Sequence, residues 1–433
     1  MGTNETSSRR SFLQTSATVA GASLLPGSAL AAASGRQDEL LKVALIGCGG
    51  RGSGAITQAL RTAGNVRLVA LADAFRDRLD GCLAEVSQNV PEDRIDVPEE
   101  RKFVGFDAYE KAMAEDVDVV VLTTPPGFRP MHFEHAIAKG KHVFMEKPVA
   151  VDGPGIRKVL AAGEEAKRKN LKVGVGLQRH HSAAYIETVR RIHAGAIGDI
   201  RLLRVYWNSA GVWTRPREEG QSEMEYQMRN WYYFNWLCGD HICEQHIHNL
   251  DVGNWVMKGY PVKAQGQGGR QVRTGIEHGE IFDHHMVEYT YADGTVMLSQ
   301  CRHIPGTATS VSEHAHGTTG SANIGASRIE TPQGKWRYQG EGSDPYQVEH
   351  DKLFAAIRAD EAYSEVERGA KSTLTAILGR MATYSGQKVT WDQALNSDIE
   401  LAPEAYAWNA APPTMPDSEG RYPIPTPGVT KSV

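Results

Sequence analysis

The sequence predicts a two-domain α/β protein in which a doubly wound parallel sheet comes first. An α+β domain with a large open, mainly antiparallel sheet is expected to follow. Short apolar strands alternate with helical segments over residues 40–178, the pattern of a doubly wound sheet. Longer runs of alternating polarity dominate residues 179–400. The 433 residues, 41% hydrophobic and 23% charged, are enough for two such domains.

A glycine-rich turn follows the first predicted strand, residues 42–46, and leads into a helix. Its glycines suit a tight turn, close approach of a diphosphate and packing of the helix on the strand, and the free N–H groups at the start of the helix attract an anion. A second strand, residues 66–72, ends about 20 residues beyond the turn in an aspartate, where a carboxylate takes a ribose 2′-hydroxyl. The segment therefore predicts a dinucleotide site made by Gly47, Cys48, Gly49, Gly50, Arg51, Gly52 and Asp73.

The first domain continues with the same alternation and is expected to end near residue 178. Helices are predicted at 76–87, 108–114, 132–139 and 153–168, and strands at 117–122, 142–145 and 172–177.

The second domain contains strand-like runs and two late helices. The runs cover residues 201–207, 283–291 and 295–301, with a turn at 292–294 between the last two. Helical segments near 347–383 are expected to pack back against the first domain. The final segment, residues 401–433, holds seven of the twenty prolines, which predicts an extended strap over a neighbouring surface or disorder.

Residues 1–33 are expected to be a targeting signal. Ser8-Arg9-Arg10-Ser11-Phe12-Leu13 precedes an apolar run at 17–30 and a group of small residues, a pattern that resembles a twin-arginine export signal. The run is shorter than the ~20 residues of a membrane span and contains Pro26 and Gly27. We therefore expect a periplasmic or membrane-peripheral protein without an integral membrane segment in the mature chain.

The charge and the cysteines narrow the function further. A net charge of −5, with no basic run beyond the N-terminus, gives no reason to expect a nucleic-acid partner and favours a small-molecule ligand. The five cysteines are too few and too scattered for a disulfide framework. They are Cys48, Cys82, Cys238, Cys243 and Cys301.

Further motifs accompany the glycine turn. They are Thr123-Thr124-Pro125-Pro126, Glu146-Lys147-Pro148, Glu244-x-x-x-His248-x-x-Asp251 and Gly369-Ala370-Lys371-Ser372. Together they resemble the Gfo/Idh/MocA family, named for glucose–fructose oxidoreductase and inositol dehydrogenase. The resemblance covers nearly the whole mature chain. It implies a Rossmann domain at 40–178, a nicotinamide dinucleotide cofactor and a sugar or cyclitol substrate. It also implies a homo-dimer or homo-tetramer joined through the open sheet.

The resemblance also implies roles for three catalytic residues, Lys147, His248 and Glu244. The family's lysine lies beside the nicotinamide and the substrate hydroxyl. Oxidation of a carbinol requires a base for the hydroxyl proton and gains from a cation near the developing alkoxide, which suits His248 and Lys147. The family usually has aspartate where this chain has Glu244. On a helix the i, i+4 spacing would place Glu244 and His248 on one face, where they could instead pair only as a polar core.

Other residues are expected to contact the ligands. Gln178 and Arg179 follow the last predicted strand, at the sheet edge where doubly wound proteins bind ligands. Asn230 and Trp231 offer a donor and an aromatic face to a sugar ring, although aromatic segments also form cores. The further expected cofactor contacts are Thr124, Pro125, Glu146, Lys147 and Gln178. The expected substrate contacts are Lys147, Arg179, Asn230, Trp231 and His248.

A metal site is the rival interpretation of residues 238–248. Zinc prefers cysteine and histidine ligands, which are concentrated there. Their spacing matches no closed tetrahedral pattern, so we expect no metal. The residues are Cys238, His241, Cys243, His246 and His248.

The predicted cofactor is NAD, because Asp73 would repel a 2′-phosphate, although the nearby Arg76 leaves NADP open. The predicted function is an oxidoreductase acting on a secondary alcohol of a sugar, cyclitol or derivative. The alternative is an NAD-dependent glycoside hydrolase that oxidises C3 transiently, eliminates, hydrates and reduces. A non-catalytic dinucleotide-binding protein is disfavoured by the presence of Lys147 and His248. Export to a compartment without free NAD favours a tightly bound cofactor.

Overall fold

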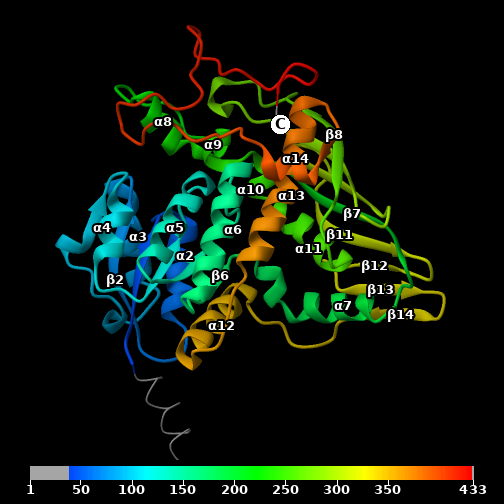
Figure 1. The fold of residues 1–433 in the computed structure, drawn as a ribbon, viewed down its shortest axis with the longest axis horizontal. Coiled ribbons are helices and arrows are strands. Elements are labelled where there is room, and N and C mark those ends of the chain that lie inside the picture. The colour runs from blue at the N-terminus through cyan, green and yellow to red at the C-terminus, as the bar shows by residue number, and fades with distance from the viewer. Residues whose placement is uncertain (1–38, 432–433) are drawn as a thin grey trace, which may run out of the picture.

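A computed structural model describes residues 39–431, which form two sheets with helices between and around them (Figure 1). The expected export signal at residues 1–33 lies outside the described residues. Among residues 39–431, no helix is both long and apolar enough to cross a membrane.

The first sheet is parallel and doubly wound, which confirms the predicted fold class. Within residues 39–431 it has six strands in the order β3-β2-β1-β4-β5-β6. This order reverses direction between β1 and β4, and doubly wound proteins bind ligands at such a switch point. The strands are β1 (Leu41–Ile46), β2 (Val66–Asp73), β3 (Lys102–Val104), β4 (Val119–Leu122), β5 (His142–Met145) and β6 (Val173–Val175).

Helices cover both faces of this sheet, so its central strands are buried throughout: β4 is fully buried along its length. Late in the chain, α12 (Pro345–Ala359) returns to pack against the helix that follows the glycine turn. The other helices of this region are α2 (Gly50–Leu60), α3 (Arg76–Ser87), α4 (Ala108–Ala114), α5 (Arg129–Ala138) and α6 (Gly153–Arg168).

One helix begins three residues earlier than the predicted 132–139. The observed α5 starts at Arg129, and Pro130 lies in its first turn. A proline is tolerated there because the N–H it lacks has no partner within the helix at that position. This shift brings Arg129 to the start of the helix.

The second sheet is open and mostly antiparallel. In the described part of the chain it has nine strands in the order β14-β13-β12-β11-β7-β10-β9-β8-β15, and only β7 and β10 pair in parallel. The strands are β7 (Ile200–Ser209), β8 (Lys263–Gly269), β9 (His284–Thr290), β10 (Val296–His303), β11 (Ser310–Gly317), β12 (Ser321–Asn323), β13 (Arg328–Thr331), β14 (Gly334–Arg337) and β15 (Val389–Thr390).

Helices cover one face of this sheet, so its strands alternate between buried and partly exposed residues. The long α13 (Val366–Ser385) lies between the two sheets and contacts both α6 and β8 (Figure 1). On the opposite face Met286 of β9 is 49% exposed. The remaining helices are α7 (Ala183–His193), α8 (Glu223–Arg229), α9 (Asn235–Cys238), α10 (His241–Glu244), α11 (Ile247–Met257) and α14 (Trp391–Asn396).

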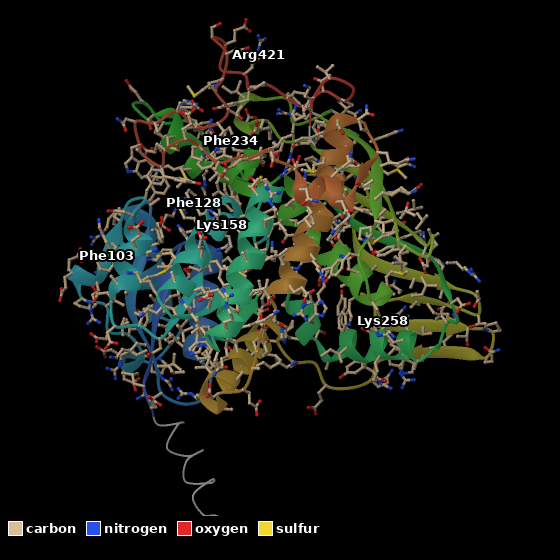
Figure 2. All side chains as sticks on the ribbon, viewed as in Figure 1. Phe103, Phe128, Lys158, Phe234, Lys258 and Arg421 are labelled. Atoms are coloured by element: carbon tan, nitrogen blue, oxygen red, sulfur yellow. The ribbon has the colours of Figure 1, made fainter. Side chains whose placement is uncertain are left out.

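The C-terminal segment beyond residue 400 contains no helix or strand in its described part and runs over the top of α8 and α9 in the view of Figure 1. Figure 2 shows Phe234 below this segment, which also carries Arg421. The rings of Phe234 and Tyr422 meet edge to face at 4.9 Å. The segment therefore packs on the second domain as an extended strap.

Candidate active site

The glycine turn has the shape that a dinucleotide requires. Gly47 has a φ of +99°, and a Cβ there would lie 2.5 Å from the backbone nitrogen of Thr124. By contrast, a Cβ on Gly49 or Gly50 would meet nothing within 4 Å. Helix α2 begins at Gly50 without a side-chain cap or an acidic residue in its first turn. Open space thus lies beside free N–H groups, and these residues fit a diphosphate.

Asp73 ends β2 at the edge of the same space. Its Oδ2 accepts a hydrogen bond from the Cys48 backbone at 2.6 Å, and its Oδ1 accepts one from the Phe75 backbone at 2.9 Å. Burial raises the pKa of this carboxyl, partly offset by those two bonds. The Cys48 thiol itself is buried and directed at the carbonyl of Ala72, so Cys48 contributes to the turn through its backbone.

Two ion pairs lie at the ends of β5 and β1, where Lys147 and Arg51 each bind a glutamate. Lys147 Nζ donates to Oε1 of Glu244 at 3.0 Å and also to the Glu244 carbonyl. Arg51 donates from Nε to Oε1 of Glu146 at 2.5 Å and approaches Glu349 at 3.7 Å. These contacts join the first domain to residues that lie about 100 and 300 positions later in the chain.

The helix expected to carry Glu244 and His248 is interrupted. Helix α10 ends at Glu244 and α11 begins at Ile247, with Gln245 and His246 between them. Both Glu244 and His248 nevertheless line one cavity. Glu244 and His248 are therefore not one turn apart on a single helix, and the Glu244 side chain reaches Lys147 from the end of α10.

His248 is 7% exposed, and its Nδ1 has no hydrogen-bond partner among residues 39–431. Burial holds the pKa of this imidazole well below its usual range, and the charges of Lys147 and Arg179 act in the same direction. The ring is therefore neutral at neutral pH, which is the state a proton acceptor needs. Trp207 lies parallel to it at 6.1 Å between ring centroids.

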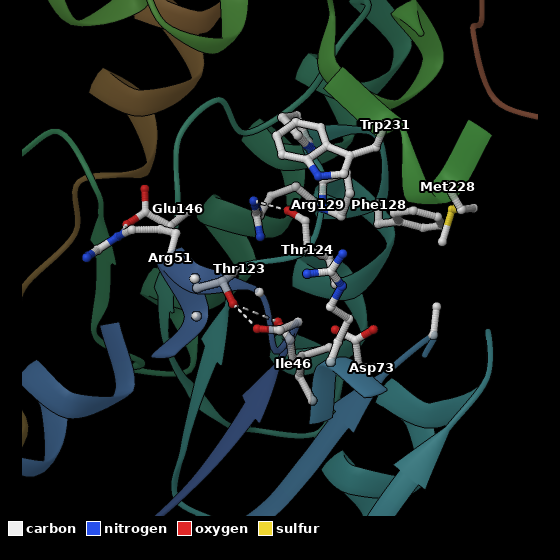
Figure 3. A pocket seen from close by; sticks show the side chains of 18 of the residues that line it. Ile46, Arg51, Asp73, Thr123, Thr124, Phe128, Arg129, Glu146, Met228 and Trp231 are labelled. Carbon is white, nitrogen blue, oxygen red and sulfur yellow. Dashed lines mark hydrogen bonds and ion pairs between the residues drawn. The ribbon is translucent and has the colours of Figure 1, made fainter. Parts of the chain in front are cut away.

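A cavity of about 730 Å³ connects these groups. It extends from the glycine turn and Asp73 to Lys147 and His248, and Figure 3 shows part of its wall, with residues from both domains. The predicted site residues in its wall are Gly47, Gly49, Gly50, Arg51, Gly52, Asp73, Thr124, Pro125, Glu146, Lys147, Trp231, Glu244 and His248. Residues far apart in the sequence thus form one continuous site.

Four expected contacts lie outside the cavity wall: Cys48, Gln178, Arg179 and Asn230. Asn230 is fully buried: its Oδ1 accepts from the Arg215 backbone at 2.8 Å and its Nδ2 donates to the Glu277 carbonyl at 2.7 Å. The expected substrate contact of Asn230 is therefore corrected, because both ends of its amide hold protein backbone. Arg179 is paired with the buried Glu313, and Gln178 donates to Tyr346 Oη at 2.9 Å.

Several cavity residues were not predicted from the sequence. Trp207 adds an aromatic face beside His248, Trp213 adds one beside Trp231, and Tyr346 reaches the cavity from α12. Gln245 follows Glu244 directly, and its Oε1 lies 2.7 Å from His303 Nε2. Adjacency to a predicted site residue could have indicated Gln245, whereas the others depend on long-range packing.

A histidine cluster lies close to the segment considered for a metal. The ligand atoms of Asp240, His241 and His285 lie within 4.8 Å of one another, and all three residues are buried. The carboxylate of Asp240 already accepts hydrogen bonds from the His241 and Phe282 backbones and from Tyr384 Oη. A metal ion would have to displace these donors, so the group is better explained as a hydrogen-bonded anchor for α10.

Curated relatives match only part of this chain. The inositol 2-dehydrogenase of Ralstonia nicotianae is 30% identical over 241 residues, which are 55% of this chain and 60% of that protein. The inositol 2-dehydrogenase of Klebsiella pneumoniae is 26% identical over 260 residues, 59% of this chain and 66% of that protein. The chain thus spans less than two thirds of the length of either relative.

Solved structures share the fold. Levoglucosan dehydrogenase in complex with NADH and levoglucosan has a TM-score of 0.63 at 17% identity, over 82% of this chain and 100% of that one. Aldose-aldose oxidoreductase from Caulobacter crescentus has a TM-score of 0.62 at 18% identity, over 81% and 100%. Apo scyllo-inositol dehydrogenase from Lactobacillus casei has a TM-score of 0.61 at 19% identity, over 82% and 99%.

Two family models match consecutive parts of the chain. Residues 41–177 match the oxidoreductase family with an NAD-binding Rossmann fold, and residues 185–323 match the GFO/IDH/MocA C-terminal domain. The cofactor class predicted from the glycine turn and Asp73 is thereby confirmed as NAD. Because the two models together cover more than half of the sequence, the chain belongs to the Gfo/Idh/MocA family of oxidoreductases.

Proposed function

We propose that this protein is an NAD-dependent oxidoreductase that acts on a secondary alcohol of a sugar, a cyclitol or a derivative. The observation that carries the proposal is the meeting of Lys147, Glu244 and His248 in the cavity that also contains the glycine turn. The aromatic faces of Trp207, Trp213 and Trp231 suit the apolar side of a sugar ring. The named relatives and structural neighbours act on inositols and sugars, which supports the same substrate class.

The chain's own groups perform the proton chemistry. His248 is neutral and takes the hydroxyl proton at Nε2, since Nδ1 is sealed in the protein interior. Lys147 stabilises the developing alkoxide, and Glu244 holds the ammonium group in place through its carboxylate and its carbonyl. The bound NAD supplies the hydride acceptor.

The surroundings of the cavity favour NAD over NADP. The Asp73 carboxylate would accept a hydrogen bond from the ribose 2′-hydroxyl of NAD and would repel the 2′-phosphate of NADP. Arg76, the residue that could attract a 2′-phosphate, is paired with Asp80 at 2.9 Å and with Glu99 at 2.5 Å. Its charge is thus engaged by two carboxylates, and Arg76 is not part of the cavity wall.

The proposal is tested by mixing the purified protein with inositols, aldoses and aryl glycosides while NADH and released aglycone are followed separately. We expect net NADH formation with a sugar or cyclitol. Lys147→Ala and His248→Ala should each lower turnover by at least about 100-fold with NAD affinity nearly unchanged. Retained activity in either variant contradicts the assigned roles. Aglycone release without NADH supports the glycoside hydrolase alternative instead.

The cofactor is proposed to stay bound through turnover. Arg229 of the second domain pairs with Asp77 at 3.2 Å and lies over the Phe75 ring at 4.0 Å, close to Asp73. These contacts bridge the two domains at one end of the cavity. Protein purified without added nucleotide should carry about one NAD per chain by mass spectrometry, and an empty preparation that binds NAD only weakly would contradict the proposal.

Location and assembly are further parts of the proposal. Arg9 and Arg10 support export by the twin-arginine route to the periplasm, and replacing both by lysine should abolish the periplasmic fraction.

The open face of the second sheet exposes Met286 and supports a homo-dimer or homo-tetramer. Light scattering should give a multiple of the chain mass, reduced by Met286→Glu; a monomeric wild type would contradict the assembly.

A further inference from the structure

Arg129 is a buried arginine without a counterion. It is the first residue of α5 and is 1% exposed. Its Nη2 donates to the Thr124 carbonyl at 2.6 Å, but its Nε and Nη1 have no partner among residues 39–431. No salt bridge joins it to a carboxylate within the same residues. A positive charge with two unused donors is therefore held inside the protein.

The nearest acid does not neutralise this charge. Glu146 attracts Arg129, but its Oε1 is already bound by Arg51 at 2.5 Å. Burial lowers the pKa of Arg129 to about 10, so the guanidinium stays protonated at neutral pH. An uncompensated buried charge is strongly destabilising, and buried cations in proteins are as a rule paired with an anion. The missing anion is expected to come from a ligand.

The cavity lies next to Arg129. Arg129 is part of the cavity wall, and Figure 3 shows its side chain between Thr124 and Trp231. It follows β4, which is one side of the switch point, while α2 follows β1 on the other side. The two sides touch, because Gly47 packs directly on Thr124. An anion between them meets uncapped N–H groups on one side and a guanidinium on the other.

Two other arginines of the cavity, Arg51 and Arg229, differ from Arg129. Arg51 is paired with Glu146 and Glu349, and Arg229 is paired with Asp77 and Glu225. Their charges are thus compensated by protein groups. Arg51 keeps one unpartnered donor, Nη2, but its charge is compensated, whereas Arg129 has two unpartnered donors and no counterion among residues 39–431.

We propose that Arg129 binds the diphosphate of the bound dinucleotide from the β4 side of the switch point, opposite the glycine turn. This inference deepens the proposed function and rests on its cofactor. A guanidinium fork matches phosphate oxygens in geometry and charge. The alternative anion for Arg129 is a substrate carboxylate. The substrate end of the cavity, at Lys147 and His248, already has the Lys147 cation, and the experiment below separates the two possible ligands of Arg129.

The test compares ADP-ribose, which contains the diphosphate, with adenosine, which lacks it. Binding is measured by calorimetry on charcoal-treated, full-length protein. In Arg129→Met we expect the affinity for ADP-ribose to fall by about 10-fold to 100-fold and that for adenosine to stay unchanged. The ligand-free variant should melt at the same or a higher temperature than wild type, because an uncompensated charge has been removed.

Arg380 provides a matched control. It is 5% exposed, lies outside this cavity, and donates to the carbonyls of Gly239 and Val151. Arg380→Met should therefore destabilise the protein while its folded fraction binds ADP-ribose as wild type does. The opposite signs of the two stability changes separate a ligand-binding arginine from a structural one.

Unchanged ADP-ribose affinity in Arg129→Met overturns the inference, and a raised substrate KM with unchanged ADP-ribose affinity assigns Arg129 to the substrate instead. If Arg129→Met does not fold, Arg129→Lys is used in its place. Lysine keeps the positive charge but not the two-pronged guanidinium geometry. Weaker ADP-ribose binding by Arg129→Lys supports the inference, and binding equal to that of wild type contradicts it. A wild type that binds ADP-ribose yet oxidises no sugar overturns the proposed reaction alone.

Discussion

His248 shows how a side chain acquires its chemistry from its surroundings. Its position follows from a sequence motif, but its neutral state follows from burial and from the nearby cations Lys147 and Arg179. An imidazole in water would be half protonated near pH 6.5. The same ring in this cavity stays neutral over a wider pH range.

The pH dependence of kcat/KM tests this view of His248. Because its pKa is lowered, the ring stays neutral as the pH falls, and the rate should not decline near pH 6.5, where an ordinary histidine becomes protonated. A decline centred at or above about 6.5 would show an ordinary histidine. The measurement is a pH–rate profile under substrate-limiting conditions, with a stability profile to exclude unfolding.

At this scale the sequence could predict the motif residues and not their partners. Local sequence patterns identify Gly47, Asp73, Lys147 and His248 and predict the chemistry of each. Arg129 carries no such pattern, because its importance depends on burial and on the absence of a counterion. Both properties are set by residues distant in the sequence.

Among the elements, the C-terminal strap has the clearest link to the site. Trp408 packs on Phe75 at 5.3 Å and on Phe106 at 4.6 Å between ring centroids, and both phenylalanines line the cavity. A further ring, Tyr406, lies 5.4 Å from Phe128, another cavity residue. The strap thus supports the cavity wall from outside.

Trp408→Ala should therefore speed the release of bound NAD. Two aromatic contacts contribute roughly 0.5–1.5 kcal/mol each, so we expect dissociation to be at least about 5-fold faster. The tryptophan is 37% exposed, and its loss should change the melting temperature little. Trp336→Ala, on β14 and away from the cavity, is the control. An unchanged release rate would show that the strap does not retain the cofactor.

The proline content of this segment left two outcomes open, a strap or disorder. Its aromatic residues decide between them, because they find partners on the two domains. Such partners cannot be identified from the composition of the segment. The start of α10 has a similar origin, since Asp240 caps this helix while it contacts β9 and α13.

For the whole molecule, Glu365 links the first sheet to α13, the helix between the two sheets. Its Oε2 accepts from the Val175 backbone of β6 at 2.9 Å, its Oε1 lies 3.1 Å from His181 Nε2, and it pairs with Arg368 of α13. Burial alone would raise the pKa of Glu365, but the His181 hydrogen bond and the Arg368 charge reverse this and lower it to about 2. The carboxylate therefore contributes to the stability of the joined domains.

This contribution should depend on pH in a defined window. A carboxyl whose pKa is lower in the folded than in the unfolded protein stabilises fully above the unfolded value of 4.5 and loses its effect as the pH falls toward about 2. The shift corresponds to roughly 3 kcal/mol at neutral pH. Glu365→Gln should lower the free energy of unfolding at pH 7 by up to about that amount and flatten its pH dependence below 4.5.

Denaturant titrations at several pH values measure this effect. The exposed Glu330 of β13 offers a control, because Glu330→Gln should leave both the stability and its pH dependence nearly unchanged. Identical pH profiles for wild type and Glu365→Gln would contradict a stabilising role of this buried carboxylate.

The sequence by itself determined the parallel sheet, the glycine turn with Asp73, and the motifs that contain Lys147 and His248. These features rest on local periodicity and spacing, which the chain encodes within short segments. Only the tertiary structure decided that Asn230 is buried, that the strap supports the cavity and that Arg129 lacks a counterion. Burial and pairing depend on which distant residues meet, and that is settled by packing of the whole chain.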